Sequence, residues 1–279
     1  DIPDLVDALR AIEDIDLSME PSLKKQTFKR PEYTDDALDR PVHPIQLNGF
    51  DLIAEIKGRS PAEGQLTLGE ESRADRASLY AEGGAAAISV LTEPHYFDGK
   101  LSHLSEVVDA VGDRELPVMR KDFLVSIGQI LEAKAAGASG ILLIAAMLDQ
   151  KQLTALLDCA FEHKLFVLLE SFSSDDLGRT ARLLERPVYL DQARQNKLLV
   201  GVNTRDLRSL AVDSTRLSRL NSFIPAGTTG VAESGLKTVE DACQAARWGY
   251  QMVLVGTALM RAERPDLLIQ NMLASGRNA

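Results

Sequence analysis

The amino-acid sequence predicts an α/β fold, a (β/α)8 TIM barrel with an N-terminal helical extension. Eight apolar runs of strand length recur along the chain, and segments with the spacing of amphipathic helices separate them. Strands that alternate with helices form a parallel sheet, and runs this rich in Val, Ile and Leu are typical of strands buried on both faces. The runs begin roughly 30 residues apart, which suits one strand–helix unit each. Eight such units in a chain of 279 residues fit a closed barrel better than an open doubly wound sheet.

The eight predicted strands are LIAEIK (52–57), AAAISVL (85–91), LPVMRK (116–121), GILLIAA (140–146), LFVLLE (165–170), KLLVGVN (197–203), TTGVAES (228–234) and MVLVG (252–256). Several of the helical segments between them close on glycine, which favours the end of a helix. No GxGxxG motif follows the first strand, and this argues against a dinucleotide-binding sheet.

Residues 1–50 precede the first strand, and we expect them to form an extension that packs on a barrel domain of residues 51–279. Residues 2–13 have the pattern of one amphipathic helix. The segment 38–50 contains two prolines and is expected to wrap under the barrel. Residues 182–197 make the fifth connection long, and we expect a short additional helix there.

Composition and charge exclude several classes of protein. The formal net charge of −10 disfavours nonspecific binding to nucleic acid or to anionic membranes. No run approaches 18 apolar residues, and the acidic N-terminal stretch is the opposite of a secretory signal. Cys159 and Cys243 lie in apolar, helix-like segments without CxxC spacing, so we expect buried reduced thiols in a cytoplasmic protein.

Polar residues stand at the carboxyl ends of five predicted strands, where barrels of this type gather their chemistry. They are Glu55, Lys57, Lys121, Glu170, Asn203, Glu233 and Ser234. Any one of them could be a solvated exit into a loop, but a closed barrel would bring all seven to one mouth. Residues two apart on a strand point to the same face, so Glu55 and Lys57 form an acid–base pair inside an otherwise apolar strand. Paired acids and bases in one cavity suit stepwise proton transfers on a bound substrate.

The ends of the seventh and eighth strands suggest a phosphate site. Gly235 follows the seventh strand in ESGL, and Gly256 and Thr257 follow the eighth in VGTAL. Glycine lets backbone N–H groups approach an anion closely, and this is where such barrels frequently hold phosphate. Each glycine alone could serve only its turn.

Three further features have two interpretations each. The segment SPAEG (60–64) is either a plain turn or a mobile flap over the site. Tyr96 and Phe97 either pack in the core or form a wall for an aromatic substrate. Arg205 either pairs locally with Asp206 or binds a substrate carboxylate. The four histidines show no metal-ligand spacing, and we expect neither a metal nor a cofactor.

The chain resembles the indole-3-glycerol-phosphate synthase family over roughly residues 50–262. The resemblance rests on the motifs IAEIKGRSP, ISVLTEPHYFDG, RKDFL, LLE, GVNTRDL, AESGL and LVGTALM, in this order. It implies a cofactor-independent carboxy-lyase of tryptophan biosynthesis. This family closes the ring of 1-(2-carboxyphenylamino)-1-deoxyribulose 5-phosphate to give indole-3-glycerol phosphate, with loss of carbon dioxide and water. The implied partner is therefore a small phosphorylated, anthranilate-derived substrate, and we expect a monomer, with weak homo-oligomerisation as the alternative.

The resemblance also implies roles for individual residues. Lys121 matches the general acid that protonates the ketone, Glu170 a carboxylate that moves protons, and Lys57 a lysine that engages the substrate carboxylate. Glu55, Asn203, Glu233 and Ser234 match the polar shell that orients these groups. Substrate contacts are implied for Ser60, Phe97, Phe123, Arg205 and Leu207, and a phosphate cradle for Gly235, Gly256 and Thr257.

Three departures from the family pattern stand out. The flap carries Ala62 and Glu63 where a hydroxyl and a basic or small residue are usual, which adds a negative charge near an anionic substrate. The fifth connection is longer than usual, and residues 19–50 match the family's N-terminal extension poorly. Two alternatives are another phosphate-binding barrel enzyme, such as an aminoketose isomerase, and a noncatalytic ligand-binding barrel. The isomerase would need a Cys/Asp pair at the first and fifth or sixth strands, and the sequence has none there.

Overall fold

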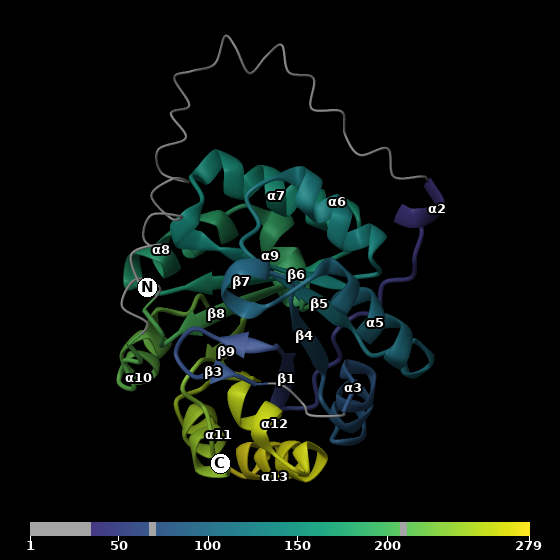
Figure 1. Ribbon diagram of the computed structural model, residues 1–279. Coiled ribbons are helices and arrows are strands. Elements are labelled where there is room, and N and C mark those ends of the chain that lie inside the picture. Colours follow the sequence, from purple (N-terminus) through teal and green to yellow (C-terminus); the bar gives the residue numbers. More distant parts are fainter. Residues whose placement is uncertain (1–34, 67–70, 207–210) are drawn as a thin grey trace.

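The barrel is closed by eight parallel strands. The computed structural model describes residues 35–66, 71–206 and 211–279 (Figure 1). The barrel strands are β1 (Asp51–Ile56), β4 (Ala87–Leu91), β5 (Val118–Lys121), β6 (Gly140–Ile144), β7 (Phe166–Ser171), β8 (Leu198–Asn203), β9 (Thr229–Glu233) and β10 (Met252–Val255). Their spatial order is β1-β10-β9-β8-β7-β6-β5-β4, so each strand pairs with its neighbours in the chain and β1 closes the ring with β10. The predicted (β/α)8 barrel is thereby confirmed, strand by strand.

Helices surround the barrel and follow its strands (Figure 1). The α-helices are α2 (Asp35–Leu38), α3 (Arg73–Glu82), α4 (Pro94–Phe97), α5 (Leu101–Val111), α6 (Ile127–Ala135), α7 (Gln150–Glu162), α8 (Ser174–Leu184), α9 (Pro187–Arg194), α10 (Arg216–Leu220), α11 (Val239–Arg247), α12 (Thr257–Arg261) and α13 (Pro265–Arg277). Short 3-10 turns lie at η2 (Gly112–Arg114), η3 (Ala145–Met147) and η4 (Asn221–Phe223). The additional helix expected in the fifth connection is α9, which begins at Pro187, a residue suited to the first helical position.

Local sequence explains where five of these helices begin. Capping boxes open α3, α6, α7, α8 and α11. In α8, for example, the Ser173 hydroxyl accepts from the Asp176 N–H, and the Asp176 carboxylate accepts from the Ser173 N–H. A side-chain N-cap stabilises a helix by about 1 kcal/mol. These caps fix the point at which each strand-to-helix loop ends, and so the shape of the barrel's rim.

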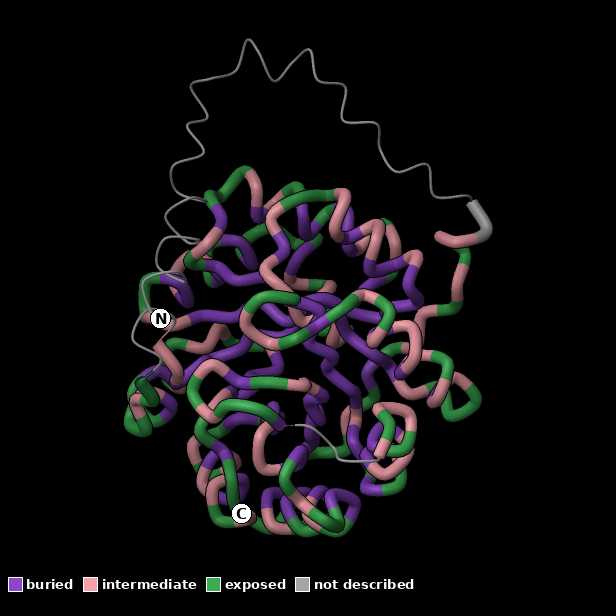
Figure 2. Tube along the Cα trace, in the orientation of Figure 1, coloured by how far each residue is buried: buried purple, intermediate pink, exposed green. Residues whose placement is uncertain are grey.

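The core has two layers, one between strands and helices and one inside the barrel. Figure 2 shows the strands buried along their length. Gly140 leaves room for the inner layer, because a Cβ there would lie 2.3 Å from the ring of Phe166. Ile45 joins this inner layer from the segment before β1. The His43 N–H donates to Ser139 Oγ (3.0 Å) and the Asn48 N–H to Asp51 Oδ2 (2.7 Å), so this segment runs beneath the amino ends of the strands.

The helix predicted over residues 2–13 lies outside the described residues, and the division of the chain at residue 50 stays a prediction. Cys159 on α7 and Cys243 on α11 are both buried. None of the helices in the described part of the chain has the length and apolar character that crossing a membrane would need.

Candidate active site

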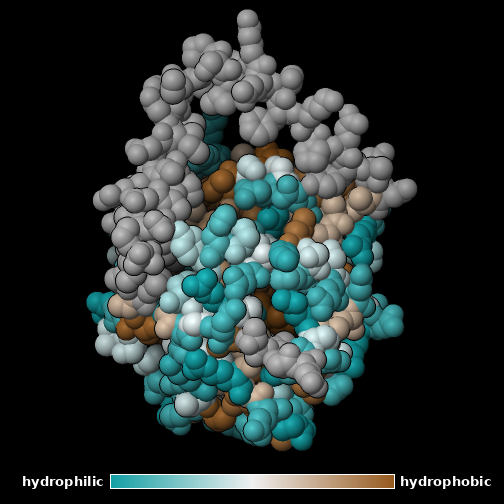
Figure 3. Space-filling model, viewed as in Figure 1, coloured by the Kyte–Doolittle hydropathy of each residue, from teal (hydrophilic) through white to brown (hydrophobic). Residues whose placement is uncertain are grey.

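A cavity opens at the carboxyl ends of the strands, and all eight strands or the loops after them contribute to its lining. Apolar side chains show near the centre of this face, inside a hydrophilic surround (Figure 3). The cavity brings together Glu55, Lys57, Ser60, Phe97, Lys121, Phe123, Glu170, Asn203, Arg205, Glu233, Ser234, Gly235, Gly256 and Thr257. These are all of the candidate residues predicted from the sequence except Leu207, which lies outside the described residues.

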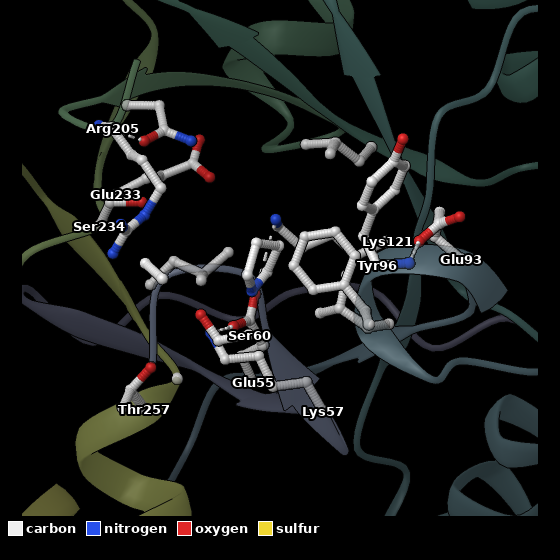
Figure 4. Close-up of a pocket in the computed structure, with 18 of the residues that line it drawn as sticks. Glu55, Lys57, Ser60, Glu93, Tyr96, Lys121, Arg205, Glu233, Ser234 and Thr257 are labelled. Carbon is white, nitrogen blue, oxygen red and sulfur yellow. Dashed lines mark hydrogen bonds and ion pairs between the residues drawn. The ribbon is translucent and has the colours of Figure 1, made fainter. Parts of the chain in front are cut away.

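Four ionisable side chains form one layer across the top of the barrel interior. Glu55, Lys121, Glu170 and Glu233 come from β1, β5, β7 and β9, the first, third, fifth and seventh strands of the barrel. Alternate strands of a (β/α)8 barrel contribute the members of one interior layer. The layers below are apolar, so the charges meet only at the cavity floor. Figure 4 shows Glu55, Lys121 and Glu233 pointing into the same space.

Glu55 is held between two ammonium groups. Its Oε1 lies 2.5 Å from Lys57 Nζ, and its Oε2 lies 3.6 Å from Lys121 Nζ. Burial opposes ionisation of Glu55, but the two lysines outweigh it and hold the pKa of this carboxyl below its usual value. Burial likewise opposes the charge on Lys121, yet Glu55, Glu170 and Glu233 together raise its pKa. Lys121 is therefore an ammonium group that can donate a proton.

Glu170 and Glu233 form the opposite kind of pair, two carboxyl groups buried together. Each side chain is almost completely enclosed. Among the described residues, Glu170 Oε2 and both carboxylate oxygens of Glu233 have no hydrogen-bond partner. Burial, and then the charge of Glu170, raise the pKa of Glu233 well above its usual value. Glu233 therefore keeps its proton to a higher pH than an ordinary carboxyl does.

Two glycines make room for these carboxylates. A Cβ on Gly201 of β8 would lie 1.9 Å from Glu233 Oε1, and a Cβ on Gly256 would lie 2.2 Å from Glu55 Oε1. Gly256 was predicted as part of a phosphate cradle, and the structure gives it this additional role beside Glu55. The sequence analysis missed Gly201, although a glycine inside an apolar strand indicates close approach by another group.

Hydrogen bonds within the loop after β4 fix the aromatic side of the cavity. Glu93 caps α4, since its carboxylate accepts from the N–H groups of His95 (2.9 Å) and Tyr96 (2.7 Å). Tyr96 and Phe97 thereby line the cavity, as the wall interpretation predicts. Glu93 also lines the cavity and was not foreseen, although a carboxylate directly before a proline is a typical N-cap.

Arg120 connects this loop to the one that carries Phe123. Its guanidinium donates to Thr92 Oγ1 (3.0 Å) and to Asp122 Oδ2 (2.9 Å), and Asp122 Oδ1 accepts from the Phe123 N–H (2.8 Å). The arginine is buried outside the barrel wall, while Lys121 beside it points inside. Of these two adjacent residues of β5, Arg120 therefore holds the two loops together, and Lys121 forms part of the cavity floor.

The turn after β9 and the start of α12 lie side by side at the other end of the cavity. Ser234 and Gly235 both have left-handed backbone conformations (φ 65° and 75°), and the Thr204 hydroxyl donates to Ser234 O (3.0 Å). Gly256 precedes α12, which begins at Thr257. The residues that follow the neighbouring strands β9 and β10 therefore line the same cavity. They are Ser234, Gly235, Gly256 and Thr257.

The segment SPAEG forms a hairpin rather than a simple turn. Its strands are β2 (Arg59–Ser60) and β3 (Gly64–Gln65), paired antiparallel. Ser60, Pro61 and Glu63 line the cavity, so the hairpin covers part of the mouth. Arg205 also lines the cavity, and its backbone N–H donates to Asn203 Oδ1 (2.9 Å).

Replacing Glu233 by glutamine should remove a pH dependence of stability. Between the ordinary carboxyl value of 4.5 and its raised pKa, Glu233 keeps its proton when folded and loses it when unfolded. The folded state binds more protons in that window, so the stability of the parent protein falls as pH rises through it. As pH rises from 4.5 towards the raised pKa of Glu233, we expect the melting temperature of Glu233→Gln to rise relative to that of the parent. Below this pH range, the substitution should give no gain in melting temperature. Thermal unfolding across pH 4–9 measures this, with exposed Glu162→Gln as control. A pH-independent difference would contradict the raised pKa of Glu233.

Comparisons with known proteins agree with this picture. The family model for indole-3-glycerol phosphate synthase matches residues 36–272. A protein of that name from Nocardioides sp. is 39% identical over 232 residues, covering 83% of each chain. Another from Salinibacter ruber is 34% identical over 276 residues, covering 99% of this chain and 96% of the other.

Solved structures show the same fold at low sequence identity. The 3-hexulose-6-phosphate synthase of Salmonella typhimurium superposes with a TM-score of 0.60 at 14% identity, covering 81% of this chain and 98% of that one. The thiamine phosphate pyrophosphorylase of Pyrococcus furiosus gives 0.56 at 13% identity, covering 83% and 97%.

Proposed function

The chain belongs to the indole-3-glycerol phosphate synthase family, and we propose that its strand-end cavity carries out the family's ring closure with the residues described above. The activity is that of a decarboxylating lyase in tryptophan biosynthesis. One observation carries the assignment of the site: the layer of Glu55, Lys121, Glu170 and Glu233 at the cavity floor, enclosed by all eight strand ends.

Ring closure begins when an aromatic carbon attacks the substrate ketone. The carbonyl oxygen becomes a hydroxyl and needs a proton as the carbon–carbon bond forms. Lys121 supplies it, because three carboxyl groups keep it protonated and its ammonium group lines the cavity. The attacking ring carbon then carries both the new bond and the carboxylate, and the anilino nitrogen becomes an iminium that accepts electrons. Loss of carbon dioxide returns the bonding pair to the ring.

Dehydration follows, and it needs a base and an acid at the same place. Glu170 accepts a proton from the intermediate, and Lys57 protonates the departing hydroxyl, which leaves as water. Lys57 is poised for this by its 2.5 Å contact with Glu55, which holds the ammonium group at the cavity wall. Glu233 and Asn203 orient the reacting groups from β9 and β8. The overall reaction is redox-neutral, so these acids and bases suffice for its proton transfers.

Different parts of the cavity bind the phosphate end and the aromatic end of the substrate. Backbone around Ser234, Gly235, Gly256 and Thr257 receives the phosphate. Phe97 and Phe123 flank the anilino ring, and Lys57 and Arg205 engage its carboxylate. Ser60 contacts the substrate from the hairpin, and the same role is proposed for Leu207. We propose that the enzyme acts as a cytoplasmic monomer on this small molecule.

Incubation of the purified protein with 1-(2-carboxyphenylamino)-1-deoxyribulose 5-phosphate tests the function. We expect the fluorescence of an indole product to appear with multiple turnovers. A folded protein that produces no indole-3-glycerol phosphate from this substrate would contradict the proposal.

A further inference from the structure

Glu63 stands at the turn of the β2–β3 hairpin with its side chain turned inward. Its neighbours Ala62 and Gly64 are exposed, whereas the Glu63 side chain is only 17% exposed and lines the cavity. The sequence analysis treated this residue as an unfavourable negative charge near an anionic substrate. The structure instead gives the carboxylate two cationic partners.

These partners lie across the cavity mouth from the hairpin. Glu63 Oε1 is 3.3 Å from Lys237 Nζ, and Oε2 is 2.8 Å from Arg261 Nη1. Arg261 Nη2 also donates to the backbone carbonyl of Glu63 (3.3 Å). Burial opposes ionisation of Glu63, but hydrogen bonding and attraction to these cations keep its pKa below the usual value. One residue therefore makes three polar contacts at a single hairpin tip.

The two cations belong to the connections that contain the proposed phosphate site. Lys237 lies two residues after Gly235 and directly before Thr238, which caps α11. Arg261 ends α12, the short helix that begins at Thr257. The contacts of Glu63 thus join the first connection of the barrel to the seventh and the eighth. A hairpin attached in this way covers the phosphate end of the cavity.

We propose that Glu63 is a positioning residue, which fastens the hairpin to Lys237 and Arg261 so that Ser60 and Pro61 stay over a bound phosphorylated substrate. The proposal deepens the proposed function and rests on it. Lys237 and Arg261 are more than half exposed, so the attachment is weak enough to open for substrate entry and product release. Its loss should speed the escape of substrate and leave the buried ionisable layer unchanged.

The direction in which KM changes in each variant distinguishes attachment of the hairpin from a simple effect of charge on substrate binding. If Glu63 acted only through its charge, Glu63→Gln would strengthen binding of the anionic substrate and Arg261→Gln would weaken it. If the contact positions the hairpin, both substitutions break the same attachment. We therefore expect both to raise KM several-fold with kcat within about two-fold of the parent, and the double variant to add little to either, as for residues in direct contact.

Hydrogen exchange of residues 58–66 without substrate gives a readout independent of catalysis. We expect faster exchange in Glu63→Gln and Arg261→Gln, and parent-like exchange and kinetics in Glu240→Gln. Glu240 forms an ion pair with Arg247 of the same helix, α11, at 3.7 Å. A lower or unchanged KM in Glu63→Gln, or unchanged exchange, would overturn the proposal. Absence of turnover in the parent would instead contradict the proposed function, and exchange would still decide whether the attachment exists.

Discussion

Substitution of Lys121 by methionine should lower turnover about 10²–10⁴-fold, the range for loss of a general acid. Methionine keeps most of the side-chain volume and removes the ammonium group that interacts with Glu55, Glu170 and Glu233. The ketone oxygen then has no proton donor when the aromatic carbon attacks. We expect the loss in kcat rather than in KM, since the phosphate and aromatic contacts lie elsewhere in the cavity. Steady-state kinetics with circular dichroism of the folded protein measure the effect.

A second buried lysine provides the control. Lys134 on α6 is buried but lies away from the cavity, where it donates to the carbonyl of Arg40. Lys134→Met should alter stability and leave kcat near the parent value. Near-normal turnover in Lys121→Met would remove its proposed role.

Substitution of Gly201 by alanine should lower kcat/KM about 100-fold although it adds one methyl group. The new Cβ would lie 1.9 Å from Glu233 Oε1 and 3.2 Å from Leu168 Cδ1, so the carboxylate must move. Displacement of a reacting group by about 1 Å can reduce the rate 10²-fold. Overpacking of the barrel interior should also destabilise the protein by about 1–3 kcal/mol. Kinetics and chemical denaturation of the same preparation measure both effects.

Gly112 is the matched control for that substitution. It follows α5 with an ordinary helical φ of −56°, and among the described residues no atom beyond its immediate chain neighbours lies within 4 Å of the position its Cβ would take. Gly112→Ala should retain parent activity and stability. Full activity in Gly201→Ala would show that the position of Glu233 does not matter for the reaction.

Strand periodicity and barrel geometry account for what the sequence could predict. Alternation along β1 places Glu55 and Lys57 on one face, and the closed strand order brings Lys121 and Glu170 to the same layer. These relations depend only on which residue ends each strand, so they can be derived without coordinates. The fold and most of the cavity lining follow from them.

Contacts between loops far apart in the sequence could not be predicted in this way. Glu63 meets Arg261 across 198 positions, and Arg120 meets Thr92 across 28, because of how individual loops bend. The clash that a side chain at Gly201 would create likewise depends on the rotamer of Glu233. Periodicity assigns a face to each residue, but it does not say which atom of a neighbouring strand occupies the space.

The formation of carbon dioxide and indole-3-glycerol phosphate, counted together, tests the central claim most directly. Purified protein is given the carboxyphenylamino substrate labelled at its carboxylate carbon, and both products are quantified. The buried acid–base layer predicts one labelled carbon dioxide for each indole-3-glycerol phosphate formed, and the loss of both in parallel in Lys121→Met. Consumption of the substrate without labelled carbon dioxide, or full release of both products by Lys121→Met, would contradict it.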